Sequence, residues 1–136
     1  MTDKINVSFE ITDIYNFGDF RAFIKYLLVN ESKYNVYIIS NNDSTAYILA
    51  VGEQLGIDSN NRIVTNFSED KLQAIIDRNI HIHLDNILSF VNRVENETDA
   101  YGILVDSKVD KYGVRQRYME IFERLEEQIT RDRNET

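Results

Sequence analysis

The stretch at residues 79–94, NIHIHLDNILSFVNRV, contains the two patterns on which the fold assignment depends. Its first part alternates apolar and polar side chains as a β-strand does, and its second part has the three- and four-residue apolar spacing of a helix. One acidic residue, Asp85, stands at the junction. Asp85 or Asn86 is expected either to cap the helix or to lie where ligands bind, at the carboxyl end of a parallel strand.

The same order of strand and helix recurs along the whole chain. The expected strands are residues 5–11, 35–40, 62–67, 80–84 and 101–105. The expected helices lie around residues 20–28 and at 44–55, 69–78, 87–94 and 113–131, with Ser68 as a cap for the third and Gly56 ending the second. This alternation predicts an α/β fold with a doubly wound, Rossmann-like, five-stranded parallel sheet and helices on both faces. Residues 1–131 form one domain in this interpretation, and 132–136 a polar tail.

The composition limits the classes of function. The chain has 136 residues and no cysteine, which excludes disulfides, thiolate zinc sites and thiol catalysis. The net charge of −8 opposes general nucleic-acid binding, because the phosphate backbone is a polyanion. Neither a basic start followed by an apolar stretch nor a run of about 18 apolar residues is present, so we expect a cytoplasmic protein with no membrane partner.

Polar residues follow three of the expected strands, and the carboxyl ends of parallel strands meet at one edge of a sheet. They are Glu10, Thr12 and Asp13 after the first strand, Ser40, Asn41 and Asn42 after the second, and Asp85 and Asn86 after the fourth. Lys71, near the start of the third helix, is expected to reach the same cleft. Carboxylates and amides suit a divalent cation such as Mg²⁺, and N–H groups with a lysine suit a phosphate.

These segments resemble the haloacid dehalogenase-like (HAD) superfamily. The resemblance rests on VSFEITDI, YIISNND, DKLQAII, IHIHLDN and YGILV in this order, and it covers about four fifths of the chain. It implies roles for residues at the matching positions. Glu10 would stand at the position of the nucleophile, Thr12 at that of the acid/base, Ser40 in the second motif, Lys71 in the third, and Asp85 with Asn86 in the fourth, where Mg²⁺ would be held together with Glu10.

The first motif departs from the family pattern, which has Asp at both positions. Glu10 has one more methylene than Asp, and a displacement of roughly 1 Å costs an in-line attack about a hundredfold. Thr12 cannot act as a general acid or base near neutral pH. Making Asp13 the nucleophile would place Tyr15 at the acid/base position, and we favour that register less. The connections after the first and third expected strands are too short for a cap, so the resemblance implies a capless member.

Each candidate residue also has a structural interpretation. Asp85 and Asn86 can serve only as helix caps, residues 40–44 form a capping cluster of their own, and a lone lysine such as Lys71 is usually solvated. His81 and His83 lie two residues apart on one side of a strand. Such a pair can bind a metal, but in a buried strand it more often fills space beneath a helix.

Three functions remain open at this point. The favoured hypothesis is a HAD-like protein with a degraded phosphotransfer site that acts as a protein-binding or regulatory module. The alternative is a Mg²⁺-dependent phosphatase with an accessible or large substrate, and a weaker third possibility is an acidic decoy for a DNA-binding partner. The fifth strand's edge and the last helix, with Tyr101, Tyr112 and Tyr118 nearby, are candidates for homodimer formation. All HAD-derived roles require Glu10 and Ser40 to meet Asp85 at one pocket.

Overall fold

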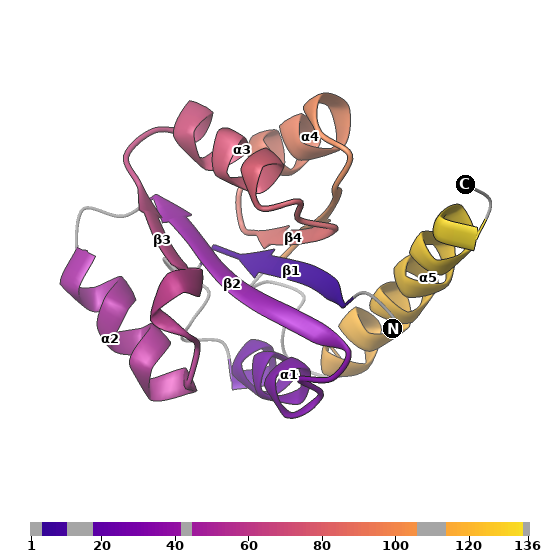
Figure 1. The fold of residues 1–136 in the computed structure, drawn as a ribbon, viewed down its shortest axis with the longest axis horizontal. Helices are drawn as coiled ribbons and strands as arrows, with labels where there is room; N and C mark the ends of the chain where they lie inside the picture. The colour runs from indigo at the N-terminus through magenta and orange to yellow at the C-terminus, as the bar shows by residue number, and fades with distance from the viewer. Residues whose placement is uncertain (1–3, 11–17, 42–44, 106–113, 135–136) are drawn as a thin grey trace.

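The predicted parallel sheet is present in the structure, a computed structural model that describes residues 4–10, 18–41, 45–105 and 114–134 (Figure 1). The strands are β1 (Ile5–Phe9), β2 (Tyr34–Asn41), β3 (Arg62–Thr65), β4 (Ile82–Asp85) and β5 (Tyr101–Leu104). Their order in the sheet is β3-β2-β1-β4-β5, and every neighbouring pair is parallel. Strand β1 is therefore central, with β2 on one side and β4 on the other.

The helices cover both faces of the sheet, as predicted (Figure 1). They are α1 (Gly18–Val29), α2 (Thr45–Leu55), α3 (Ser68–Asp77), α4 (Leu88–Glu97) and α5 (Val114–Asn134), with a short 3-10 turn, η2 (Ser59–Asn61). Helices α3 and α4 lie together on one face, and α1 and α2 lie on the other. Strand β2 begins one residue earlier and ends one residue later than predicted.

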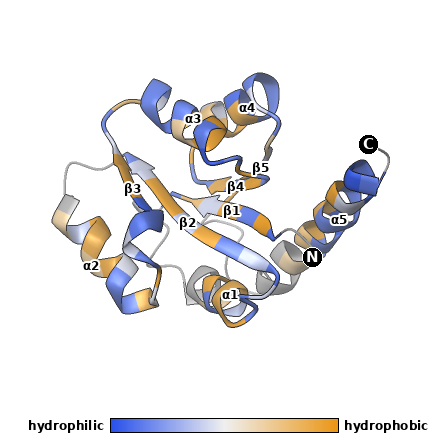
Figure 2. Cartoon of the chain, in the orientation of Figure 1, coloured by the Kyte–Doolittle hydropathy of each residue, from blue (hydrophilic) through white to orange (hydrophobic). Residues whose placement is uncertain are grey.

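The two faces of the sheet have different cores, because successive side chains of a strand point to opposite faces. Val7 and Phe9 of β1 belong to the larger cluster, which α1, α2 and α5 cover with Phe23, Ile24, Leu27, Ile48, Val51, Phe122 and Ile129. The smaller cluster, under α3 and α4, consists of Ile39, Leu72, Ile75, Ile80, Phe90, Val94 and Ala100. Figure 2 shows the apolar residues of the helices facing the sheet. Polar side chains of β1 and β4 interrupt the smaller cluster, and there the site is built.

Three predicted boundaries near the site are corrected by the structure. Strand β1 ends at Phe9, and the backbone N–H of Glu10 donates to the carbonyl of Leu84 at 2.9 Å. Strand β4 includes Asp85, which therefore ends the strand instead of following it. Ser68 is the first residue of α3 and not its cap, since the capping position belongs to Phe67, which makes no side-chain cap hydrogen bond.

Helices α4 and α5 are longer than predicted. Helix α4 ends at Glu97, whose carboxylate pairs with Arg93 one turn earlier at 2.7 Å. Helix α5 ends at Asn134, so residues 132–134 are helical and not part of a tail. Arg133 fixes this last turn, because its Nη2 donates to the carbonyl of Lys4 at 3.3 Å. Polar side chains here extend the helices beyond their apolar stripes.

The structure explains why glycine stands at two positions of the chain. Gly56 has a φ of 79° and follows the last residue of α2, as predicted for a helix terminator. Gly102 lies where α4 approaches β5, and a Cβ there would be 2.9 Å from both Cγ1 and the carbonyl oxygen of Val91. Within the described ranges, no helix is both long and apolar enough to span a membrane.

Candidate functional site

The carboxyl ends of β1, β2 and β4 bring the predicted site residues together. Glu10 directly follows the central strand, between Ser40 and Asn41 at the end of β2 and Asp85 at the end of β4. The Ser40 hydroxyl donates to Oε1 of Glu10, and the backbone N–H of Asn41 donates to Oε2 at 3.1 Å. Glu10 and Ser40 are buried, at 2% and 0% exposed. The geometric prediction for the two strand ends is therefore confirmed.

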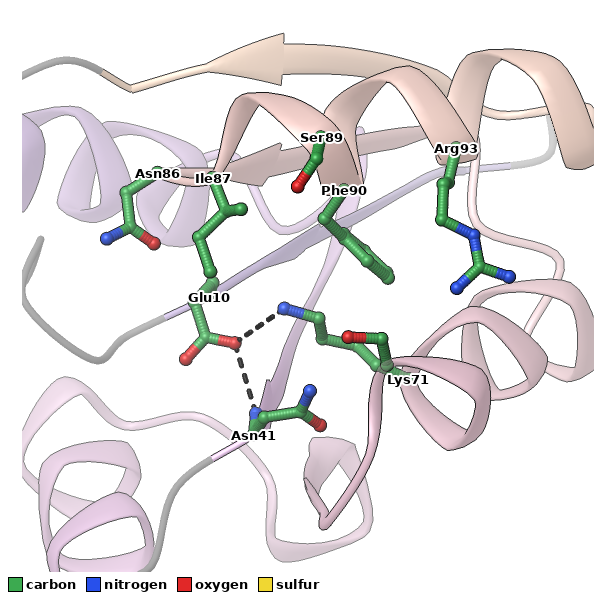
Figure 3. A pocket seen from close by; sticks show the side chains of 9 residues that line it. Glu10, Asn41, Lys71, Asn86, Ile87, Ser89, Phe90 and Arg93 are labelled. Carbon is green, nitrogen blue, oxygen red and sulfur yellow. Dashed lines mark hydrogen bonds and ion pairs between the residues drawn. The ribbon is translucent and has the colours of Figure 1, made fainter.

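Lys71 enters this cluster from the first turn of α3, as Figure 3 shows. Its ammonium Nζ donates to Oε2 of Glu10 at 3.1 Å and to Oδ2 of Asp85 at 2.8 Å. The same nitrogen lies 4.1 Å from the centre of the Phe90 ring, a cation–π contact. Lys71 is only 1% exposed, so the interpretation of a solvated lysine is wrong. One cation thus joins both carboxylates.

Asp85 is fully buried and uses both of its oxygens. Oδ2 accepts from Lys71 and contacts Nε2 of His83 at 2.9 Å, while Oδ1 accepts from the backbone N–H of Ile87 at 3.0 Å. Burial alone would raise the pKa of Asp85, but the hydrogen bond and charge of His83 together with Lys71 outweigh it and hold the pKa below its usual value. Asp85 is thereby stabilised as a carboxylate.

The expectation that Asp85 or Asn86 caps α4 is not confirmed. The capping position belongs to Ile87, which forms no side-chain cap hydrogen bond. Asp85 binds the N–H of Ile87 itself, one residue before the helix, and thus fixes the backbone that leads from β4 into α4. Its position at the strand end is the one expected for a residue of a binding site.

His83 extends the cluster to Ser8, a residue that the sequence analysis did not single out. Nδ1 of His83 lies 2.7 Å from the Ser8 hydroxyl, and both side chains are fully buried. The two ring nitrogens of His83 thus contact Ser8 and Asp85 at the same time. The two-residue spacing of Ser8 and Glu10 in the sequence indicates that both lie on one face of the strand. The pairing of Ser8 with His83 comes from the β1–β4 register of the structure.

His81 lies at the opposite end of β4 and does not join His83. Its Nδ1 accepts from the backbone N–H of Asn6 at 2.9 Å, and Nε2 lies 3.1 Å from Nη2 of Arg133. His83 instead packs edge-on against Phe90 of α4, with ring centres 5.6 Å apart. The space-filling interpretation therefore describes His83 well.

A pocket of about 180 Å³ opens beside the cluster (Figure 3). It is lined by Glu10, Asn41, Ser68, Lys71, Asn86, Ile87, Ser89, Phe90 and Arg93. Among the described residues, Oδ1 of Asn86 is buried and has no hydrogen-bond partner. Arg93 and Ser89 of α4 are lining residues that the sequence did not predict, because their spacing from Asn86 indicates a shared helix face but not a pocket.

The magnesium site expected from the sequence stays a prediction. No group of three His, Asp or Glu side chains in the described part of the chain is placed to hold a metal. The ammonium of Lys71 already lies within 3.1 Å of both candidate carboxylates, at the place where a cation would balance them. Asn86 supplies a neutral oxygen. The candidate residues Thr12, Asp13 and Asn42 lie outside the described residues.

Comparisons with protein-family models, curated proteins and solved structures find no match for this chain.

Proposed function

We propose that this chain is a non-catalytic, protein-binding module that keeps the layout of a HAD phosphotransfer site without its chemistry. The observation that carries the proposal is the state of the Glu10 carboxylate. Oε1 accepts from Ser40, and Oε2 accepts from both Lys71 and the N–H of Asn41. These bonds hold the carboxylate within the protein's own network.

A nucleophilic carboxylate has to present one oxygen to its substrate in line with the leaving group. Glu10 would have to break its buried ion pair with Lys71, and removing a partner from such a pair costs about 3–5 kcal/mol. The additional methylene of glutamate also moves the attacking oxygen by roughly 1 Å from the position that aspartate would give it. Both effects oppose phosphotransfer.

The alternative function is a Mg²⁺-dependent phosphatase acting on an accessible or large substrate. One observation favours it: Ser40 and Lys71 contact Glu10, and Lys71 also contacts Asp85. Four residues for which the resemblance to the HAD superfamily implies a role are thus connected, which supports residual activity. The ion pairs of Lys71 with both carboxylates weigh against this function.

Hydrolysis of p-nitrophenyl phosphate with and without Mg²⁺ separates the two functions. We expect no turnover from the natural chain, and a gain of Mg²⁺-dependent turnover when Glu10→Asp is combined with Thr12→Asp. Turnover by the natural chain that is lost in Asp85→Asn would overturn the proposal. Glu53→Gln, an exposed carboxylate on α2, is the control for the removal of one negative charge.

A further inference from the structure

We infer that the pocket beside Glu10 binds the ammonium or guanidinium group of a lysine or arginine side chain presented by a partner protein. This inference rests on the proposed function and adds the chemistry of the partner. It differs from the phosphate that the resemblance implies, because the electrostatics of the pocket favour a cation.

Two cationic side chains line the pocket, Lys71 and Arg93, and each is paired with two carboxylates. Lys71 is bound by Glu10 and Asp85, at 3.1 and 2.8 Å. Two carboxylates and one ammonium group give these three side chains together a formal charge of −1. The positive charge of Lys71 is therefore already balanced and does not attract an anion into the pocket.

Arg93 has the same arrangement on the other side of the pocket. Its guanidinium pairs with Glu69 of α3 at 2.7 Å and with Glu97 at 2.7 Å, so this group also carries −1. The two bridges lower the pKa values of both carboxyl groups through their hydrogen bonds with Arg93. The two groups together carry a formal charge of −2, in a chain whose net charge is −8. Glu10, Lys71 and Arg93 line the pocket itself, and the other three carboxylates contact these cations from outside the lining.

One residue that lines the pocket has a hydrogen-bond acceptor for which the described residues supply no donor. Among the described residues, Oδ1 of Asn86 is buried without a hydrogen-bond partner, and Asn86 and Ser89 both line the pocket (Figure 3). A buried acceptor without a hydrogen bond is destabilising, and a bound N–H donor removes this cost. Ammonium and guanidinium groups are pure donors, whereas phosphate near neutral pH is mainly an acceptor.

The size of the pocket fits one side chain. A cavity of about 150 Å³ accommodates benzene, with six carbon atoms. The volume of about 180 Å³ therefore suits the five or so heavy atoms of a lysine side chain or the seven or so of an arginine. Ile87 and Phe90 among the lining residues can contact its methylene groups.

The rim favours a polypeptide over a free amine. Ile87, Leu88 and Phe67 are 50%, 57% and 70% exposed, and exposed apolar side chains that lie near one another are typical of interaction sites. Ile87 lines the pocket, Leu88 follows it in the chain, and Phe67 precedes the lining residue Ser68. A partner that inserts a basic side chain between apolar neighbours would cover this rim as well as fill the pocket.

The first experiment is an NMR titration of the ¹⁵N-labelled full chain with n-butylamine, n-butylguanidine, 1-butanol and inorganic phosphate. We expect the two cations to shift the Asn86 side-chain amide and the Ile87 and Ser89 backbone amides, and butanol and phosphate to leave them unchanged. Shifts caused by phosphate instead, or no shifts with either cation, would overturn the inference.

The second experiment uses the blocked peptides acetyl-Leu-Lys-Leu-amide, acetyl-Leu-Arg-Leu-amide and acetyl-Leu-Gln-Leu-amide. We expect one of the basic peptides to bind about tenfold more tightly than the glutamine peptide and more tightly than the free amines, because charged hydrogen bonds and the rim both contribute. Free amines that bind as tightly as the peptides would overturn the assignment to a protein partner. Self-association of the chain that Ile87→Ser abolishes would place a second copy in the pocket. It would overturn the assignment to a different partner protein.

Matched variants connect binding to the two features of the pocket. Asn86→Ala and Glu69→Gln are expected to weaken binding of the basic peptide about tenfold, whereas Asn96→Ala and Glu53→Gln, at exposed positions outside the pocket, leave it unchanged. The inference would be contradicted if Asn86→Ala weakened binding no more than Asn96→Ala does, and Glu69→Gln no more than Glu53→Gln does. If the chain neither hydrolyses phosphate nor binds a cation, this inference fails while the non-catalytic assignment stands.

Discussion

Lys71 Nζ and Asp85 Oδ2 lie 2.8 Å apart, and at most 2% of either side chain is exposed. The pair links α3 to the end of β4, and the bond from Lys71 to Glu10 extends it to β1. Charges this deep in a protein persist only when they are paired and hydrogen-bonded. The site is therefore also a structural joint between the sheet and the helix above it.

Lys71→Met removes this cation while keeping the volume of the side chain. It leaves the carboxylates of Glu10 and Asp85 buried without an ammonium group, and we expect a loss of about 3–5 kcal/mol in the free energy of unfolding. Urea denaturation at neutral pH measures the change. Lys25→Met, at an exposed position of α1, is the control. A loss as small as that of the control would show that the two carboxylates do not depend on Lys71.

Asp85 gives the site a defined response to acid. Its pKa is lowered in the folded chain, so the folded state favours the ionised form more than the unfolded state does. The resulting stability is fully present above the ordinary aspartate pKa of about 4 and is lost as the pH falls toward the folded value. The free energies of unfolding of the natural chain and of Asp85→Asn, measured by urea denaturation from pH 7 to pH 3, should therefore converge at the acidic end of this range. A difference that is constant with pH would contradict the lowered pKa.

Ser8→Ala tests the buried end of the network. The substitution removes the hydroxyl that contacts Nδ1 of His83 at 2.7 Å, in a place where both side chains are fully buried. We expect a loss of about 1–3 kcal/mol in the free energy of unfolding, because a buried nitrogen loses its partner. Thr130→Ala, an exposed hydroxyl on α5, should change it by less than about 0.5 kcal/mol. Equal values for the two variants would mean that His83 does not need Ser8.

The sheet could be predicted from the sequence because its signals are local. Runs such as NVYIIS and IHIHL have strand periodicity, and Gly56 ends α2 where its backbone freedom is needed. The meeting of Glu10, Ser40 and Asp85 also followed, since parallel strands place their carboxyl ends at one edge. Topology alone determines these positions.

The contacts of Lys71 and Asn86 could not be predicted in the same way. That Lys71 would bridge two carboxylates and lie over Phe90 depends on how α3 and α4 pack against each other. The burial of Asn86 Oδ1 without a partner among the described residues likewise results from tertiary packing. Helices α4 and α5 continue past their predicted ends because polar side chains, such as Arg133 on the Lys4 carbonyl, stabilise turns that have no apolar stripe.

Gly102 tests the packing of α4 on the edge of the sheet. In Gly102→Ala the new Cβ would lie 2.9 Å from Cγ1 and from the carbonyl oxygen of Val91, and the backbone atom cannot move without shifting α4. We expect a loss of about 1–3 kcal/mol in the free energy of unfolding, the usual cost of overpacking. Urea denaturation gives the value.

Gly52→Ala is the matched control, because the three atoms nearest to its Cβ would all belong to the side chain of Arg62, with Cδ at 2.5 Å. That side chain can move away, although its Nε hydrogen bond to the Ile57 carbonyl at 2.8 Å would be disturbed. Alanine is also favoured over glycine inside a helix by about 1 kcal/mol, so the net change at Gly52 should be close to zero. If Gly102→Ala destabilises the chain no more than Gly52→Ala does, helix α4 packs less tightly on β5 than the structure indicates.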